Sequence, residues 1–126
     1  MSGDFLWTRK QTDAAATGSD ATAGFDTSKV GRGALDINVK TITGGTTPDI
    51  TFHVDRLGGD GIWYPVASTA ALTATGPVSL SICDAVADGA DAQHAVFTTQ
   101  ARVRWVFAGG VPATSIAFSG SFYGRE

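Results

Sequence analysis

Two stretches of the chain alternate between apolar and polar residues on both sides of a glycine-rich break. In the first, apolar residues occupy every second position of 35–39 and of 50–54, around a Gly-Gly/Pro break at 44–48. The second stretch, residues 101–118, repeats the pattern around another Gly-Gly pair. A period of two indicates a strand with one buried face. The two stretches therefore predict two β-hairpins that face each other across one core.

The core predicted from this alternation consists of apolar side chains from both hairpins: Leu35, Ile37, Val39, Ile50, Phe52, Val54, Val103, Trp105, Phe107, Ile116 and Phe118.

Further short strands are predicted between turn signals. The run Gly58-Gly59-Asp60-Gly61 predicts a tight turn, and Pro65 after it predicts an edge strand or a bulge, because proline has no backbone donor. Residues 68–76 fit either a strand or a long loop, and residues 84–93 are predicted to be a loop. The predicted strands cover residues 25–30, 34–42, 49–57, 62–67, 77–82, 100–107 and 115–123.

This spacing predicts an all-β fold, an antiparallel β-sandwich of about seven or eight short strands. Residues 25–126 form the sandwich domain. Residues 1–24 are predicted to be an extended N-terminal arm, because residues 12–24 are rich in Ala, Thr, Gly and Ser and show no period. The apolar group Phe5, Leu6 and Trp7 makes the arm a candidate for contact with a neighbouring subunit.

Composition supports one all-β domain and excludes several classes of partner. A chain of 126 residues with 43% hydrophobic residues can bury one core. Glu126 is the single glutamate, which disfavours long helices. The net charge of −3 gives no basic footprint for nucleic acid, and from the acid at position 4 and the lack of a long apolar run we expect neither a signal peptide nor a membrane span. Cys83 is the only cysteine, so we expect no disulfide and a small buried apolar side chain.

No catalytic motif stands out, and we expect a protein that is not an enzyme and has no cofactor. Asp84, Asp88 and Asp91 lie in one predicted loop, but a calcium loop usually needs a bidentate glutamate, so no metal site is predicted. No serine stands in a nucleophile elbow, and no glycine-rich phosphate loop precedes a helix.

The interface candidates outside the arm are aromatic residues and arginines. Trp63 and Tyr64 follow the Asp60 turn, either as packing aromatics or as a platform for sugar rings. Arg102 and Arg104 lie two residues apart on one face of their strand. They are predicted either to meet carboxylates of a neighbouring subunit or to form a solvated face.

The order of strands and turns resembles the small β-sandwich virion proteins of tailed bacteriophages. The resemblance covers residues 30–122, while residues 1–24 and 83–93 have no counterpart. It rests on Gly-Gly-Thr-Thr-Pro at 44–48, Ile-Thr-Phe-His-Val at 50–54, Gly-Asp-Gly-Ile-Trp-Tyr at 59–64, Ala-Arg-Val-Arg-Trp-Val-Phe at 101–107 and Ser-Ile-Ala-Phe-Ser-Gly-Ser at 115–121.

The resemblance implies a capsid decoration or minor capsid protein that binds and stabilises the lattice of the major capsid protein, as a homo-oligomer. Its location is then the virion, after synthesis in the host cytoplasm. A tail or head–tail connector subunit keeps the same fold at another place in the particle. A carbohydrate-binding module that uses Trp63 and Tyr64 is the alternative from a different class.

Overall fold

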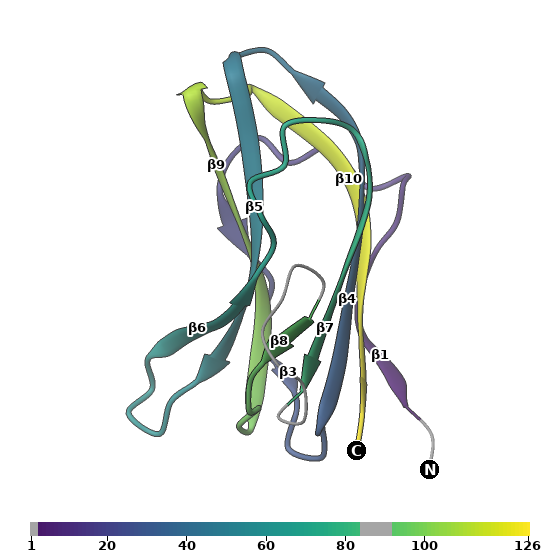
Figure 1. Cartoon of the computed structure of the whole chain (residues 1–126), viewed down its shortest axis with the longest axis vertical. Helices are drawn as coiled ribbons and strands as arrows, with labels where there is room; N and C mark the ends of the chain where they lie inside the picture. Colours follow the sequence, from purple (N-terminus) through teal and green to yellow (C-terminus); the bar gives the residue numbers. More distant parts are fainter. Residues whose placement is uncertain (1–2, 84–91) are drawn as a thin grey trace.

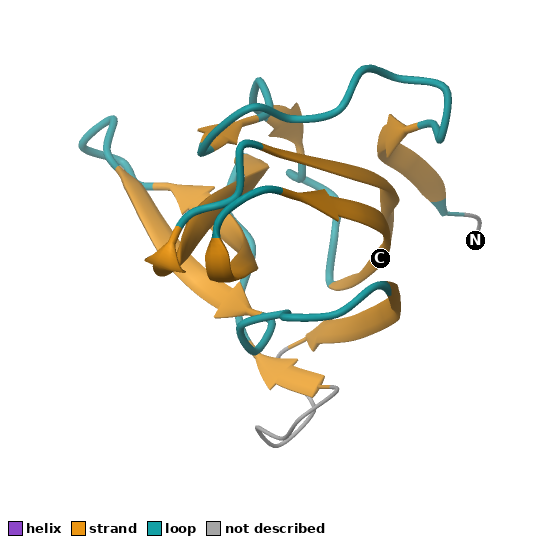
Figure 2. Cartoon of the chain, turned by 90° about the horizontal axis from the view of Figure 1, so that it is seen from above, coloured by secondary structure: helices purple, strands orange, loops and turns teal. Residues whose placement is uncertain are grey.

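The structure is a computed structural model that describes residues 3–83 and 92–126. Throughout these ranges the regular elements are β-strands, and they form two sheets that pack face to face (Figures 1 and 2). The predicted β-sandwich is therefore confirmed. The described chain contains ten strands, two of them only two residues long, rather than seven or eight. In the same ranges there is no helix with the length and hydropathy needed to cross a bilayer.

Sheet A brings together strands from both ends and the middle of the chain. Neighbouring strands are antiparallel, except that β8 runs parallel to β7. Across the sheet the described strands follow the order β1 (Asp4–Arg9), β10 (Ser115–Arg125), β4 (Arg32–Thr43), β7 (Gly76–Cys83) and β8 (Ala92–His94).

Sheet B is antiparallel, and β9 lies within it. Its order is β2 (Asp20–Ala21), β9 (Gln100–Val111), β5 (Thr46–Leu57) and β6 (Trp63–Ser68). The short strand β3 (Phe25–Asp26) also pairs with β9, farther along. Strands β5 and β6 form a true hairpin around the predicted Asp60 turn, since Leu57 pairs with Trp63.

The two glycine-rich breaks join strands of different sheets, so the two predicted hairpins are wrong. Strand β4 lies in sheet A and β5 in sheet B, and the chain returns from β9 in sheet B to β10 in sheet A. The hydrogen-bonded partners are instead β4 with β10 and β5 with β9. A strand with one buried face shows the same alternation whether its successor pairs with it or crosses to the other sheet. We call these two connections the arches.

The arches lie side by side at one end of the sandwich. The backbone amide of Thr114 donates to the carbonyl of Thr43 at 2.8 Å, and Thr46 pairs with Val111. Gly45 has a φ of +79°, and a β-carbon on it would lie 2.5 Å from the Val111 carbonyl oxygen. Glycine is therefore required there both by the left-handed backbone and by the close approach of the second arch.

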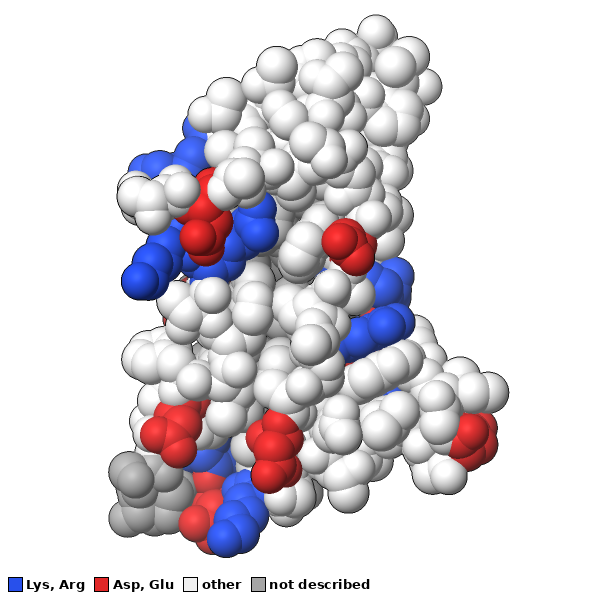
Figure 3. All heavy atoms as spheres, turned by 180° about the vertical axis from the view of Figure 1, so that it is seen from behind, with Lys and Arg blue, Asp and Glu red and all other residues white. Residues whose placement is uncertain are grey.

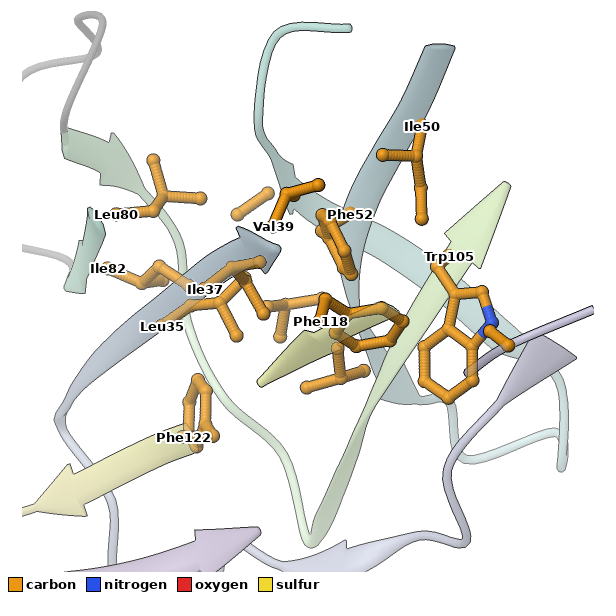
Figure 4. Packing of buried hydrophobic residues seen from close by; sticks show 14 of the residues in the cluster. Leu35, Ile37, Val39, Ile50, Phe52, Leu80, Ile82, Trp105, Phe118 and Phe122 are labelled. Atoms are coloured by element: carbon orange, nitrogen blue, oxygen red, sulfur yellow. The ribbon is translucent and has the colours of Figure 1, made fainter. Parts of the chain in front are cut away.

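The core lies between the sheets and contains the predicted side chains. The strands that face each other across it are β4 and β10 of sheet A against β5 and β9 of sheet B, rather than one hairpin against the other. Phe118 of sheet A contacts Phe52 and Trp105 of sheet B edge-to-face, with ring centroids 4.9 and 5.2 Å apart (Figure 4). Each sheet thus contributes one strand from each stretch. Phe107 is only partly buried. Three large buried residues of the core cluster lie outside the predicted set, Leu80, Ile82 and Phe122, and the other buried members of the cluster outside that set are alanines.

The described part of the N-terminal segment runs along both sheets of its own chain. Strand β1 pairs with β10, Ala16 exchanges two backbone hydrogen bonds of 2.9 Å with Ile116, and β2 and β3 pair with β9. The Trp105 indole donates to the Gly18 carbonyl at 3.2 Å. Contact of this arm with a neighbouring subunit, and a domain boundary after residue 24, stay predictions.

The predictions for the shorter strands and loops are confirmed only in part. Pro65 lies on the edge strand β6 and next to a register shift, as expected. Of the strand predicted over 25–30, only Phe25–Asp26 forms a strand, β3. Between the end of β6 at Ser68 and the start of β7 at Gly76, residues 69–75 form a loop with an isolated bridge from Leu72 to Ile50. Residues 92 and 93 belong to β8 rather than to a loop. The rest of that predicted loop, with Asp84, Asp88 and Asp91, lies outside the described residues.

Candidate interaction surfaces

The seven predicted interface residues fall on three parts of the surface. Phe5, Leu6 and Trp7 belong to β1, and Tyr64 lies on the β5–β6 hairpin. The outer face of sheet B carries the other three: Trp63, Arg102 and Arg104. The structure therefore joins Trp63 to the two arginines and leaves the β1 group apart.

Arg102 and Arg104 both bind Asp55, an acid of the neighbouring strand β5. Each Nε lies 2.9 Å from Oδ2 of Asp55, and Arg104 Nη2 lies 3.3 Å from Oδ1. The Asp55 residue is 1% exposed, whereas the arginine side chains are 25% and 28% exposed. We call Asp55, Arg102 and Arg104 the arginine–aspartate cluster.

Strand register explains how the cluster forms. Residues 50, 52 and 54 of β5 point into the core, so Asp55 points to the outer face. Asp55 pairs directly with Arg102 and lies diagonally from Arg104, which pairs with His53. These are the cross-strand positions at which side chains of an antiparallel pair meet.

The cluster holds Asp55 ionised. Burial alone would raise the pKa of this carboxyl, but hydrogen bonds from Arg104 and Arg102, together with their charges, outweigh burial and hold its pKa below the ordinary value. Two guanidinium groups around one carboxylate leave the cluster with a single net positive charge. For His53 next to the cluster, burial and then the charge of Arg104 lower the pKa, so the imidazole is neutral at pH 7.

Trp63 lies against the same cluster. The guanidinium carbon of Arg102 is 4.8 Å from the centroid of the Trp63 ring, which is a cation–π contact. A β-carbon on Gly24 would lie 3.0 Å from the far edge of the indole. Arg102 therefore occupies one face of the ring that a sugar would need, and Trp63 is half-buried.

The β5–β6 hairpin bends away from the body of the sandwich (Figure 1). At its turn the Asp60 carboxylate accepts hydrogen bonds from the Ile62 amide at 3.1 Å and the Tyr64 hydroxyl at 2.5 Å. These bonds lower the pKa of Asp60, and the hydrogen bond to Asp60 raises that of Tyr64. Ile62 is 57% exposed and Tyr64 is 43% exposed. The turn is thus internally tied, while its apolar side chains face outward.

Strand β1 forms one edge of sheet A and exposes one aromatic residue. Phe5 is 66% exposed and packs edge-to-face on Tyr123, with ring centroids 5.2 Å apart. Leu6 and Trp7 are partly buried against the core of their own chain. Of the three predicted anchor residues, Phe5 alone is left largely open for a partner.

The outer face of sheet A carries an open groove of about 510 Å³. The Asp36 carboxylate accepts a hydrogen bond from Ser79 at 2.7 Å within it. Phe5 lies at the groove, and the remaining lining includes the small side chains of Ser119 and Ser121. This groove lies on the opposite sheet from the arginine–aspartate cluster.

Within residues 3–83 and 92–126, no group of three or more His, Cys, Asp or Glu side chains is arranged to hold a metal ion. Cys83 is buried and free, as predicted. Seen from behind, charged side chains form small separate groups on a mostly neutral surface (Figure 3).

Over the described residues, the fold and these surfaces define an all-β sandwich with a buried ion cluster on sheet B. Large apolar side chains are exposed on two edges, at Phe5 and at Ile62 and Tyr64, and also at Val96 and Val111. Comparison with protein-family models, with curated proteins and with solved structures found no match to this chain.

Proposed function

We propose that this chain is a non-enzymatic structural subunit of a bacteriophage particle, which decorates and stabilises the lattice of the major capsid protein. The proposal takes the virion and the partner from the resemblance in turn and strand order. The structural observation that carries it is the placement of exposed apolar side chains on two different edges of one rigid sandwich.

Phe5 lies on β1, and Ile62 and Tyr64 lie on the β5–β6 hairpin, which are on opposite sides of the molecule in Figure 1. A subunit with two different contact patches on opposite sides suits head-to-tail contacts with neighbours in an array. Each patch is small, but many weak contacts in a lattice sum to stable attachment. Repeated homo-oligomeric contacts on the capsid fit the same geometry.

Attachment to particles tests the proposal. Particles assembled without the protein are mixed with purified wild type, Phe5→Ser or Ile62→Ser and are then sedimented. We expect the wild type to co-sediment and each variant to bind at least about tenfold more weakly, because central apolar anchors dominate interface energies. Both side chains are exposed, so the thermal midpoint of each variant should match that of the wild type.

Val111→Ser is the matched control, because Val111 is 53% exposed but lies at the arches rather than on either edge. This variant should attach like the wild type. Failure of the wild type to bind particles, or equal binding by all variants, would contradict the proposal. A truncation of residues 1–10 is a poorer test, because it also removes Leu6 and Trp7 from the core of the chain.

Tail or connector placement differs from capsid decoration only in which particle part the protein binds. Mixing the protein separately with isolated heads and isolated tails distinguishes the two. The glycan-binding alternative stays a prediction, and its test is a glycan array on which Trp63→Ala abolishes binding.

A further inference from the structure

The arginine–aspartate cluster has a built and oriented set of hydrogen-bond donors at the surface. Arg102 and Arg104 each direct Nε toward Asp55, and Arg104 adds Nη2. Three guanidinium nitrogens have no hydrogen-bond partner among residues 3–83 and 92–126: both Nη atoms of Arg102 and Nη1 of Arg104. About a quarter of each arginine side chain is exposed. Donors thus remain on two guanidinium groups whose inner edges are already fixed.

We propose that this face of sheet B binds a carboxylate side chain of a partner protein through the Nη atoms of Arg102 and Arg104 that Asp55 leaves free. The proposal rests on the proposed function and names the chemistry of one contact in the assembly. The cluster carries a net positive charge on a chain whose overall charge is −3, so an acidic side chain complements the cluster.

Preorganisation gives the cluster an advantage over ordinary surface arginines. A free arginine loses rotamer freedom when a partner binds. Here Asp55 holds both side chains, and the Trp63 ring lies against Arg102 at 4.8 Å. Arg104 also lies beside His53, its pairing partner on β5, which is neutral and does not add a second positive charge. The entropy of ordering both arginines is therefore lost on folding rather than on binding.

The geometry favours a protein carboxylate over nucleic acid. A guanidinium group matches the two oxygens of a carboxylate in one plane. A nucleic-acid surface needs several phosphate contacts along a basic stripe. The cluster provides one net positive charge, flanked by the indole of Trp63. Arginine and tryptophan side by side are typical of the centre of a protein–protein interface.

Side-chain NMR tests this contact directly on the purified protein. The Nε–Hε signals of its arginines are followed during titration with acetyl-Gly-Asp-Gly-amide and, separately, acetyl-Gly-Asn-Gly-amide. We expect saturable shifts of Arg102 and Arg104 with the acidic peptide alone, weakening as salt is added. The exposed Arg32 and Arg125 report non-specific attraction and should shift far less.

Arg104→Lys keeps the positive charge and can still bind Asp55, but it lacks the guanidinium fork. It should weaken peptide binding by about tenfold, whereas the matched variant Arg125→Lys should leave it unchanged. Equal shifts with both peptides, equal shifts at Arg32 and Arg125, or unaltered binding by Arg104→Lys would each overturn the proposal. If the protein attaches to particles but does not bind the acidic peptide, the proposed carboxylate contact is wrong and the proposed function stands. If the protein binds the acidic peptide but does not attach to particles, the proposed function is wrong and the carboxylate contact stands.

Discussion

Each outer face of the sandwich carries an acidic residue, and the two carboxylates differ in their exposure and in their hydrogen-bond partners. On sheet A, Asp36 is exposed and its carboxylate accepts one hydrogen bond, from Ser79. On sheet B, Asp55 is 1% exposed beneath two arginines. Both acids lie on strands next to the core, and both point away from it. The acid of sheet A is thus solvated, whereas the acid of sheet B carries a buried charge that depends on its two arginine partners.

A buried ion cluster is a specific arrangement rather than a source of extra stability. Removing water from three charged groups costs free energy, which their mutual attraction roughly offsets. The loss of one partner is expensive because the remaining charge stays buried. Such a cluster on an outer face, where a neutral pair would serve the fold as well, is consistent with use by a partner.

The largest expected effect comes from removing both arginines. Arg102→Ala/Arg104→Ala removes all three charge-assisted hydrogen bonds of Asp55 and should lower the free energy of unfolding by about 3 kcal/mol. Asp36→Ala on sheet A should change it by less than about 0.5 kcal/mol. Urea unfolding measures both. Similar losses for the two variants would mean that the two faces do not differ.

An intermediate effect is expected from Asp55→Asn, which keeps the size of the side chain and removes its charge. Charge-assisted hydrogen bonds contribute about 1.5–3 kcal/mol each, and neutral ones about half as much. We expect a loss of about 2 kcal/mol in the same urea assay. Asp36→Asn is the matched control and should behave like the wild type. A more stable Asp55→Asn protein would show that burial of the charge outweighs its pairing.

The pH dependence of stability separates His53 from Asp55. The pKa of His53 lies below 6.5 in the folded protein, so unfolded chains bind its proton more readily and stability falls as the pH drops below about 6.5. The pKa of Asp55 lies below 3.8, so its contribution is present above 3.8 and is lost as the pH falls through the folded value. Two stages of acid destabilisation are expected by thermal unfolding, and His53→Gln should remove the first.

The smallest effect is expected from Ser79→Ala. Its hydroxyl hydrogen bond to Asp36 is exposed, and water replaces it, so stability should change by less than about 0.5 kcal/mol. A calorimetric shift of several degrees would show that the polar face of sheet A is more tightly organised than its exposure indicates.

The fold class and most of the core were predictable because alternation reports burial directly. Leu35, Phe52 and Ile116 needed only a period of two to be placed inside. Strand pairing was not predictable in this way. Gly44-Gly45 reads as a hairpin turn, yet it crosses between the sheets, and side-chain alternation is the same in both arrangements.

The wrong pairing also hid the partner of the arginines. With β4 and β5 treated as a hairpin, nothing placed Asp55 beside Arg102 and Arg104. The sequence held only a weak signal. Asp55 follows the core residue Val54, so alternation places Asp55 on the outer face of its strand, and a strand inside a sheet has a neighbouring strand on each side. Trp63 joined the cluster for the same reason, through the pairing of β5 with both β6 and β9.

The most direct test of the central claim is an electron cryo-microscopy map of intact particles. If the chain is a structural subunit that works through two opposite edges, the sandwich will fit density at repeated positions, with β1 and the β5–β6 hairpin both against neighbouring subunits. Particles without such density, or density in which both edges face solvent, would contradict this account.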